Sequence, residues 1–444
     1  MTAKSAWLIG GTGLAALALW PVLMLGHVGR STAALAGPPT PAPVIADYVD
    51  RNRVVNFYER AVGRDRADQI MPRMLASQYL QRFREMGDVG DLLRAQNMAQ
   101  LSLRKQPRYN VAAESELSSV ALTFHDMRTA LRYARDAADL QAGKPGSDAP
   151  VASLDMELGW YAQAGNILHR RAPPQFDDAG WDAVAAHYAE LTGNLAGART
   201  LMARGMAQED SVVDNPAENR AWYHWRAGQL AFKAGDLDAA ESDYRAALAL
   251  YPKYARAFDS LAQLYEAELR WRDALAAATA GADLIPLPVT LGYKADAQRA
   301  LGDADGAAQT SDLIVTEERL GNVRGINDRL IANYYADHRM RPDDAIAIAR
   351  RDLAKRDDIY SEDTLGWALA AAGRWPEARV HAERAVRYGT QDSLLQYHAG
   401  IIELHSGARA AALGRLDMAL RLNPKFHPVY ADDARRLLQT ADSR

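Results

Sequence analysis

The sequence predicts an all-α fold in which antiparallel helix pairs stack into a solenoid, and three observations predict it. A central alanine recurs, mostly at intervals of 34 residues, at Ala95, Ala130, Ala164, Ala198, Ala240, Ala274, Ala308, Ala345, Ala378 and Ala412. In units such as 235–252 and 407–424, a glycine stands five residues before this alanine. Pro252, Pro286 and Pro424 end the segments that follow it. A fixed period of this kind is typical of repeat architectures, whose units bury their apolar faces against their neighbours.

The N-terminal segment, residues 1–36, is expected to be a signal anchor or a signal peptide. Residues 5–29 contain no Asp, Glu, Lys or Arg, and about 20 apolar residues can cross a bilayer as a helix. The length of this run favours an uncleaved transmembrane helix. The small-x-small sequence Ala34-Leu35-Ala36 favours cleavage instead. The first alternative predicts a single-pass inner-membrane protein with its body in the periplasm, and the second a periplasmic protein.

The rest of the chain divides by composition and repeat pattern. Residues 37–49 are predicted to be an extended spacer, because four prolines fall within its first ten residues. N-terminal repeat units are expected over 50–207 and C-terminal repeat units over 220–425, separated by a polar loop at 208–219. Residues 426–444 are expected to form a capping helix and a tail, since a terminal unit needs a cover with a polar outer face.

The spacing within one unit has a physical explanation. The glycine makes a turn between two helices, and small residues where the helices cross let the backbones approach closely. Proline ends the second helix because it cannot continue the hydrogen-bond ladder.

This pattern resembles the tetratricopeptide repeat family, whose signature combines small residues, a turn glycine and a final proline. The residues that carry the resemblance best are Gly228, Ala231, Gly235, Ala240, Tyr244, Ala247 and Pro252. The resemblance extends over about residues 50–425 and is weaker in the units near 70–107 and 289–320. It implies a right-handed superhelical solenoid of about 10–11 units, with a concave face lined by the first helices.

On that family model, the exposed concave positions of the central and C-terminal units are rich in aromatic and polar residues. They are Trp222, Trp225, Gln229, Arg256, Asp259, Gln263, Tyr293, Asn327, Tyr334, Asp337, Tyr360, Asp363, Trp367 and Tyr397. Aromatic and amide side chains on a rigid groove suit an extended peptide, and the aromatic ones equally suit a saccharide. The alternative is that several of these side chains bind no ligand and only pack between neighbouring units.

The composition excludes several kinds of site. The chain has no cysteine, so it forms no disulfide, thiolate metal site or cysteine nucleophile. Its net charge of -4 gives no electrostatic case for nucleic acid. His398 and His405 are seven residues apart, whereas metal ligands on a helix are usually three or four apart, so no metal site is expected. We also expect no cofactor and no catalytic residues, because the repeats leave no stretch for a catalytic domain.

These features favour a non-catalytic scaffold that binds protein partners at the cell envelope. The alternative is a periplasmic module of an export system that binds polysaccharide. The expected partners are a protein or peptide in the concave groove, the membrane through the N-terminal helix and, on the alternative, a glycan.

Overall fold

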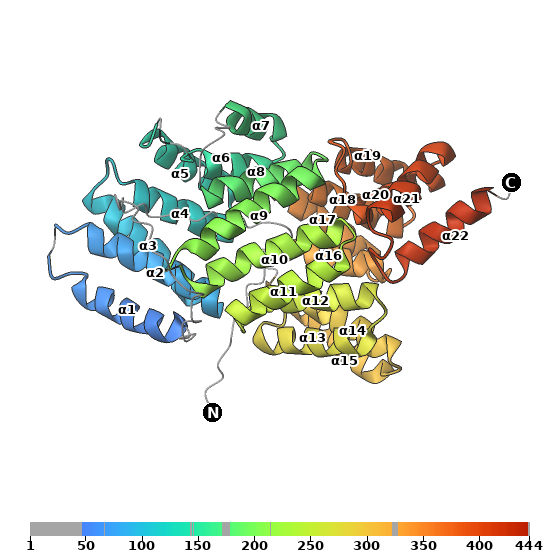
Figure 1. Cartoon of the computed structure of the whole chain (residues 1–444), viewed down its shortest axis with the longest axis horizontal. Helices are drawn as coiled ribbons and strands as arrows, with labels where there is room; N and C mark the ends of the chain where they lie inside the picture. Colours follow the sequence, from blue (N-terminus) through green and yellow to red (C-terminus); the bar gives the residue numbers. More distant parts are fainter. Residues whose placement is uncertain are drawn as a thin grey trace, which may run out of the picture.

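The computed structural model describes residues 47–442 except for residues 66, 143, 145, 171–177, 214 and 322–326. This part of the chain contains 22 helices, which form ten antiparallel pairs with one further helix at each end (Figure 1). The first helices of the pairs are α2 (Ile70–Met86), α4 (Val111–Thr123), α6 (Ala149–Glu157), α8 (Ala179–Leu191), α10 (Ala217–Lys233), α12 (Ala255–Ala267), α14 (Pro288–Ala300), α16 (Asp328–Asp337), α18 (Ile359–Ala371) and α20 (Ser393–His405). The second helices are α3 (Val89–Lys105), α5 (Met127–Asp139), α7 (Tyr161–Arg170), α9 (Leu195–Ser211), α11 (Leu237–Leu250), α13 (Trp271–Leu284), α15 (Ala304–Gly321), α17 (Pro342–Lys355), α19 (Trp375–Ala385) and α21 (Arg409–Leu422). The predicted all-α repeat solenoid is therefore confirmed.

The helix pairs are held by a recurring buried residue, the fourth of each second helix. It is at most 2% exposed in all ten pairs and is alanine in nine of them: Leu92, Ala130, Ala164, Ala198, Ala240, Ala274, Ala307, Ala345, Ala378 and Ala412. One of the predicted central alanines, Ala308, is wrong, because it is exposed and its neighbour Ala307 takes the buried place. Ala95 is buried as predicted but is the seventh residue of α3, and Leu92 takes the fourth position. Adjacent helical residues point about 100° apart, so only one of two neighbouring alanines can face the partner helix.

The first helices form an inner layer and the second helices an outer one. Each first helix from α10 to α18 contacts the first helix of the next unit, and the main contacts of a second helix are with first helices. The helix α1 (Asp47–Ala61) packs on α2 at the N-terminal end of the described helices. The helix α22 (Tyr430–Asp442) packs on α21, as expected of a cap.

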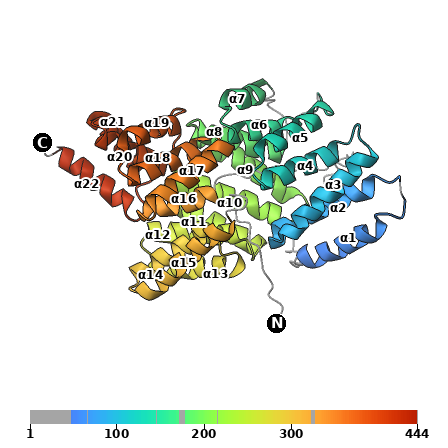
Figure 2. The same ribbon diagram turned by 180° about the vertical axis from the view of Figure 1, so that it is seen from behind.

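The N-terminal half of the solenoid packs against the C-terminal half. Seen from behind in Figure 2, α16–α18 lie over α8–α10. The largest hydrophobic cluster likewise joins residues of α6–α10, such as Met156 and Leu230, to residues of α14–α20, such as Ile331 and Leu365. The two halves therefore share one continuous core.

Three turn glycines of the N-terminal half make the closest approaches between the halves, which we call the inter-turn contacts. A Cβ at each glycine would lie under 3.0 Å from a backbone oxygen, a separation that real side chains essentially never show. The pairs are Gly159 with Asp357, Gly193 with Gly389, and Gly235 with Leu422, at 2.1, 2.3 and 2.8 Å. Each glycine also has a positive φ, between 75° and 83°. Glycine is therefore required at these turns by the backbone conformation and by the space.

Side-chain bonds reinforce the inter-turn contacts. The Tyr161 hydroxyl accepts a bond from the backbone N–H of Ile359 at 3.0 Å, 198 residues away. The Gln391 side chain accepts from the N–H of Leu195, 196 residues away, and Asn423 donates to the Phe232 carbonyl, 191 residues away. The similar separations show that consecutive N-terminal units meet consecutive C-terminal units in register.

The sequence also predicts a polar loop in the middle of the chain and two segments at its N-terminus. The polar loop predicted at 208–219 is shorter, because α9 continues to Ser211 and α10 begins at Ala217. Gln, Glu and Asp side chains are compatible with a helix, and their polarity alone does not end one. The apolar run at residues 5–29 and residues 37–46 of the predicted spacer lie outside the described residues. The last part of the spacer prediction, 47–49, is wrong, because α1 already begins at Asp47. Among the helices that are described, none has the length and apolar character needed to cross a membrane.

Candidate functional site

The inner layer is where the predicted partner-binding residues lie. Thirteen of the fourteen belong to the first helices α10, α12, α14, α16, α18 and α20, and Asn327 is the residue before α16. Their exposure differs strongly, however. Seven are buried, namely Trp225, Asp259, Asn327, Tyr334, Tyr360, Asp363 and Tyr397. Six are half-buried, namely Trp222, Gln229, Arg256, Gln263, Tyr293 and Trp367, and Asp337 is exposed.

The tryptophans of α10 serve mainly to join neighbouring units. The Trp225 ring is 7% exposed, and its Nε1 donates to the Ser260 hydroxyl of α12 at 2.9 Å. The Arg256 guanidinium lies over the same ring at 5.3 Å. Trp222 packs against the hydrophobic clusters on both sides of α10. These contacts explain the positions of both rings without a ligand.

Tyr360 belongs to a polar contact between the two halves that is centred on Lys233. The Lys233 ammonium lies 2.6 Å from Glu190 of α8 and 2.7 Å from Asp392, the N-cap of α20. It also donates to the Tyr360 hydroxyl of α18 at 2.7 Å. Burial disfavours its charge, but the carboxylates of Asp392 and Glu190 hold the pKa of Lys233 well above its usual value. Tyr360 is therefore occupied by a contact within the protein.

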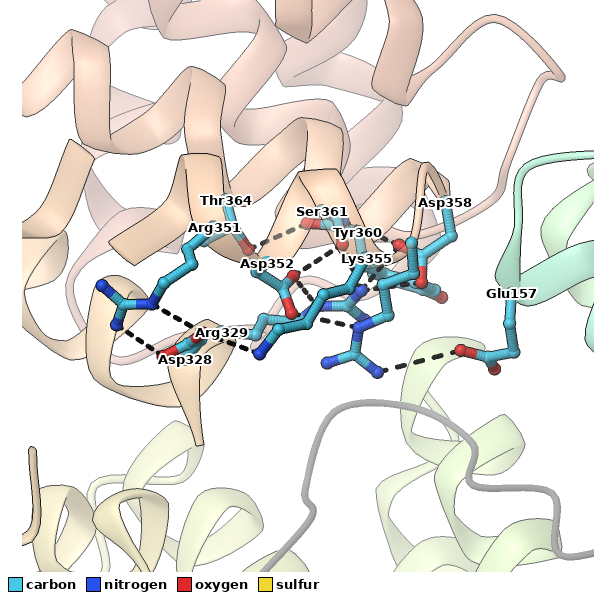
Figure 3. A network of polar contacts seen from close by, with 11 residues as sticks. Glu157, Asp328, Arg329, Arg351, Asp352, Lys355, Asp358, Tyr360, Ser361 and Thr364 are labelled. Carbon is cyan, nitrogen blue, oxygen red and sulfur yellow. Dashed lines mark hydrogen bonds and ion pairs between the residues drawn. The ribbon is translucent and has the colours of Figure 1, made fainter. Parts of the chain in front are cut away.

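A second polar network, drawn in Figure 3, lies beside the first. The Arg329 guanidinium of α16 bonds Asp358 at 2.7 Å and Asp352 of α17 at 3.2 Å. Burial would raise the pKa of Asp352, but Arg356 and Arg329 hold it well below the usual value. Arg356 also reaches Glu157 at the end of α6, 3.8 Å away in the N-terminal half. Burial, together with Asp358, raises the pKa of Glu157 to about 8.

Both networks have the same consequence. Buried charges are costly unless they are paired and hydrogen-bonded, and removing one partner leaves the others uncompensated. Where α8 and α10 meet α18 and the start of α20, the inner layer is therefore occupied by ion pairs of the protein itself.

One part of the inner layer still presents a charged group to solvent, and we call it the Asp337 cluster. It comprises Asp337 of α16, Asp363 and Trp367 of α18, Tyr397 and His398 of α20, and Tyr430 of α22. Both Trp367 Nε1 and the Tyr430 hydroxyl donate to Asp337 Oδ1, each at 2.8 Å. Four of the predicted residues thus lie together around an exposed carboxylate.

Stacked rings hold the cluster in place. His398 stacks on one face of Trp367, with ring centres 4.0 Å apart and planes within 10°. Tyr397 and Tyr430 stack at 4.7 Å. Rings packed this closely have few alternative rotamers, so the two donors on Asp337 are pre-positioned.

His398 is bound to a carboxylate behind Trp367. Its Nδ1 lies 3.0 Å from Asp363, and both side chains are buried. Burial lowers the pKa of His398, but Asp363 outweighs it and the net direction is upward. Burial also raises the pKa of Asp363, against the effect of His398. His405 makes no such pair and stacks on Trp375 at 3.9 Å.

Two members of the cluster were missed by sequence reasoning. His398 was considered only as a metal ligand, although its position next to Tyr397 on α20 was a usable signal. Tyr430 falls in the segment assigned to the cap, and its bond to Asp337 joins residues 93 apart. No repeat position predicts a contact of that kind.

The repeated helix pairs and the inner layer define an all-α solenoid of stacked antiparallel helix pairs. No protein-family model matches the sequence, and no curated protein matches it. Among solved structures, one match is the crystal structure of the APC/C hetero-tetramer Cut9–Hcn1, with 13% identity and a TM-score of 0.35. The match covers 89% of this chain and 81% of that one. A TM-score this low gives no basis for transferring a partner or a function.

Proposed function

We propose that this chain is a non-catalytic scaffold that binds a protein partner at the Asp337 cluster, on the inner face of α16, α18 and α20. One observation carries the proposal. Asp337 is exposed and flanked by positioned aromatic rings, whereas the inner layer where α8 and α10 meet α18 and the start of α20 is occupied by ion pairs of the protein itself. Aromatic anchors beside a charged group are typical of protein-binding hot spots.

The test is capture of partners from solubilised membranes with full-length protein and two single variants. Trp367→Ala removes an inner-face ring from the cluster. Trp375→Ala removes a ring of the same size from α19, in the outer layer of the same unit, and serves as the matched control. Loss of a partner with Trp367→Ala alone supports the proposal. Equal capture by both variants and the unchanged protein contradicts it. Trp225 is unsuitable for this test because its removal would disturb the packing of α10 on α12.

A glycan is the second candidate ligand, because aromatic rings beside a carboxylate also suit a sugar. One face of Trp367 is covered by His398, which leaves less ring surface for stacking. A protein partner is therefore favoured. Binding of envelope polysaccharide that is lost in Trp367→Ala, without loss of any protein partner, would favour the glycan.

The proposed location is the cell envelope, with the repeat body in the periplasm. The support is the uncharged run at residues 5–29, which is long enough for a transmembrane anchor. Comparing the mass of the full-length and mature proteins distinguishes an anchor from a cleaved signal. A mature chain that begins after Ala36 would exclude the anchor.

A further inference from the structure

We propose that the partner of this scaffold presents a basic segment, and that a lysine or arginine side chain of that segment binds Asp337. This inference rests on the proposed function and adds the chemistry of the partner. Two groups of carboxylates in this protein differ in whether an arginine or lysine lies beside them.

Most buried carboxylates of the described residues have an arginine or lysine of their own. Examples are Asp91 with Arg82 at 2.6 Å, Glu85 with Arg51 at 3.1 Å, Glu190 with Arg226 at 2.7 Å, Asp328 with Arg351 at 2.7 Å and Glu403 with Arg415 at 2.6 Å. Pairing of this kind offsets the cost of removing the carboxylate from water.

The inner face from α12 to α18 departs from this rule. Asp259, Glu266, Asp337 and Asp363 have no arginine or lysine nitrogen within 4.0 Å among the described residues. One buried oxygen of Asp259 and one of Glu266 have no hydrogen-bond partner at all. Burial raises the pKa of Asp259 to about 7 and that of Glu266 well above its usual value. The carboxyl groups of this face therefore lack the cations that balance carboxylates elsewhere in the chain, and burial favours the neutral forms of Asp259 and Glu266.

Asp337 is the member of this set that a partner can reach. Its Oδ1 accepts from two neutral donors, Trp367 and Tyr430, which orient the carboxylate without neutralising its charge. Its Oδ2 makes no hydrogen bond with any residue that the structure describes, and the side chain is exposed. Asp337 is also the last residue of α16, where the negative end of the helix dipole disfavours a carboxylate and favours a cation.

The cationic groups near the cluster are already engaged. His398 is paired with Asp363, and His338 with Asp296 at 2.8 Å. Arg299 is paired with the same Asp296. Burial lowers the pKa of His427 to about 4, so its imidazole is neutral at pH 7. A ligand cation at Asp337 would therefore meet little competition from these cationic groups of the protein.

The test uses full-length protein and a labelled peptide of alternating lysine and alanine, followed by fluorescence anisotropy. The same peptide with glutamate in place of lysine is the control for unspecific binding. We expect the lysine peptide to bind and the glutamate peptide not to bind, with an affinity that falls as salt is added. Failure of the lysine peptide to bind, or equal binding of both peptides, would overturn the inference.

Two variants locate the binding. Asp337→Asn keeps an oxygen for Trp367 and Tyr430 but removes the charge, and we expect about tenfold weaker binding of the lysine peptide. Asp417→Asn removes an exposed carboxylate from α21 in the outer layer, and we expect unchanged affinity. Asp337→Glu restores the charge and should recover most of the binding, which excludes a purely structural effect. Equal affinity of Asp337→Asn and Asp417→Asn would show that the cation does not bind at Asp337.

The same variants separate this inference from the proposed function. If Trp367→Ala loses the membrane partner and Asp337→Asn keeps it, the partner binds at the cluster without the cation, and only the inference is wrong. If neither variant changes capture, the proposed site itself is wrong.

Discussion

Replacing Gly193 by alanine tests the inter-turn contacts directly. Gly193 lies between α8 and α9 with a φ of +83°, and a Cβ there would be 2.3 Å from the Gly389 carbonyl oxygen. Gly407, between α20 and α21, has the same φ of +83° and nothing within 4 Å of its Cβ position. The two glycines thus share one backbone conformation and differ in whether the other half of the solenoid is near.

The expected magnitudes follow from this difference. An alanine in the left-handed conformation costs about 1–2 kcal/mol at either position. At Gly193 the backbones must also separate by at least 0.7 Å, the difference between the 3.0 Å limit and 2.3 Å. Overpacking of this kind costs about 1–3 kcal/mol more. Gly193→Ala should therefore lower the free energy of unfolding by about 2–5 kcal/mol and Gly407→Ala by about 1–2 kcal/mol.

Urea unfolding followed by circular dichroism measures both values. The contrast should recur with Gly159→Ala, which meets Asp357 at 2.1 Å, and be smaller with Gly235→Ala, which meets Leu422 at 2.8 Å. If Gly193→Ala and Gly407→Ala shift the midpoint equally, the two halves are not packed together in solution and the reasoning fails.

Three further changes test other parts of the structure. Lys233→Met leaves Asp392 without its cation, while Glu190 keeps Arg226, and we expect the free energy of unfolding measured in urea to fall by about 3 kcal/mol. The control is the pair of Lys425 with Glu268, where Lys425→Met should lower the free energy of unfolding by less than about 1 kcal/mol. Ala307→Leu should lower the free energy of unfolding by about 1–3 kcal/mol because Ala307 is 2% exposed, whereas Ala308→Leu on the solvent side should change it by at most about 0.5 kcal/mol. Thermal unfolding of both variants checks this, and a larger loss for Ala308→Leu than for Ala307→Leu would show that Ala308 is the buried alanine. Burial raises the pKa of Asp259 from 3.8 to about 7, so between these pH values the folded state holds a proton that the unfolded state releases, and stability falls as the pH rises. Asp259→Asn should flatten this part of the plot of stability against pH. An unchanged slope would show that other groups cause the pH dependence.

The sequence predicts the helix pairs well because they depend on local spacing. A turn glycine followed five residues later by a buried alanine needs information from one unit only, and Gly235 with Ala240 is an example. The register fails where two alanines are adjacent, as at Ala307 and Ala308, because composition does not show which one faces inward. It also fails where Leu92 replaces alanine in the first pair.

The site is predicted less well, because exposure depends on how the units wind. The fourteen candidates lie in the inner layer as expected, but seven are buried, some between units and some between the two halves. Trp225 is covered by the next unit, and Tyr360 by Lys233, 127 residues away. Small rotations between units add up over such distances, and no residue of a single unit encodes their sum.

The regular separation of the inter-turn contacts limits how this chain can change in length. Bonds such as those of Tyr161 with Ile359 and of Leu195 with Gln391 join positions 198 and 196 residues apart. Duplicating or deleting one repeat between Gly235 and Asp357, the stretch that all three glycine pairs enclose, would place every glycine turn opposite the wrong neighbour and would misalign all these bonds at once. Repeats added before α1 or after α22 would not. An ordinary solenoid tolerates such events anywhere along its length, whereas this one can gain units without breaking these contacts only at its ends.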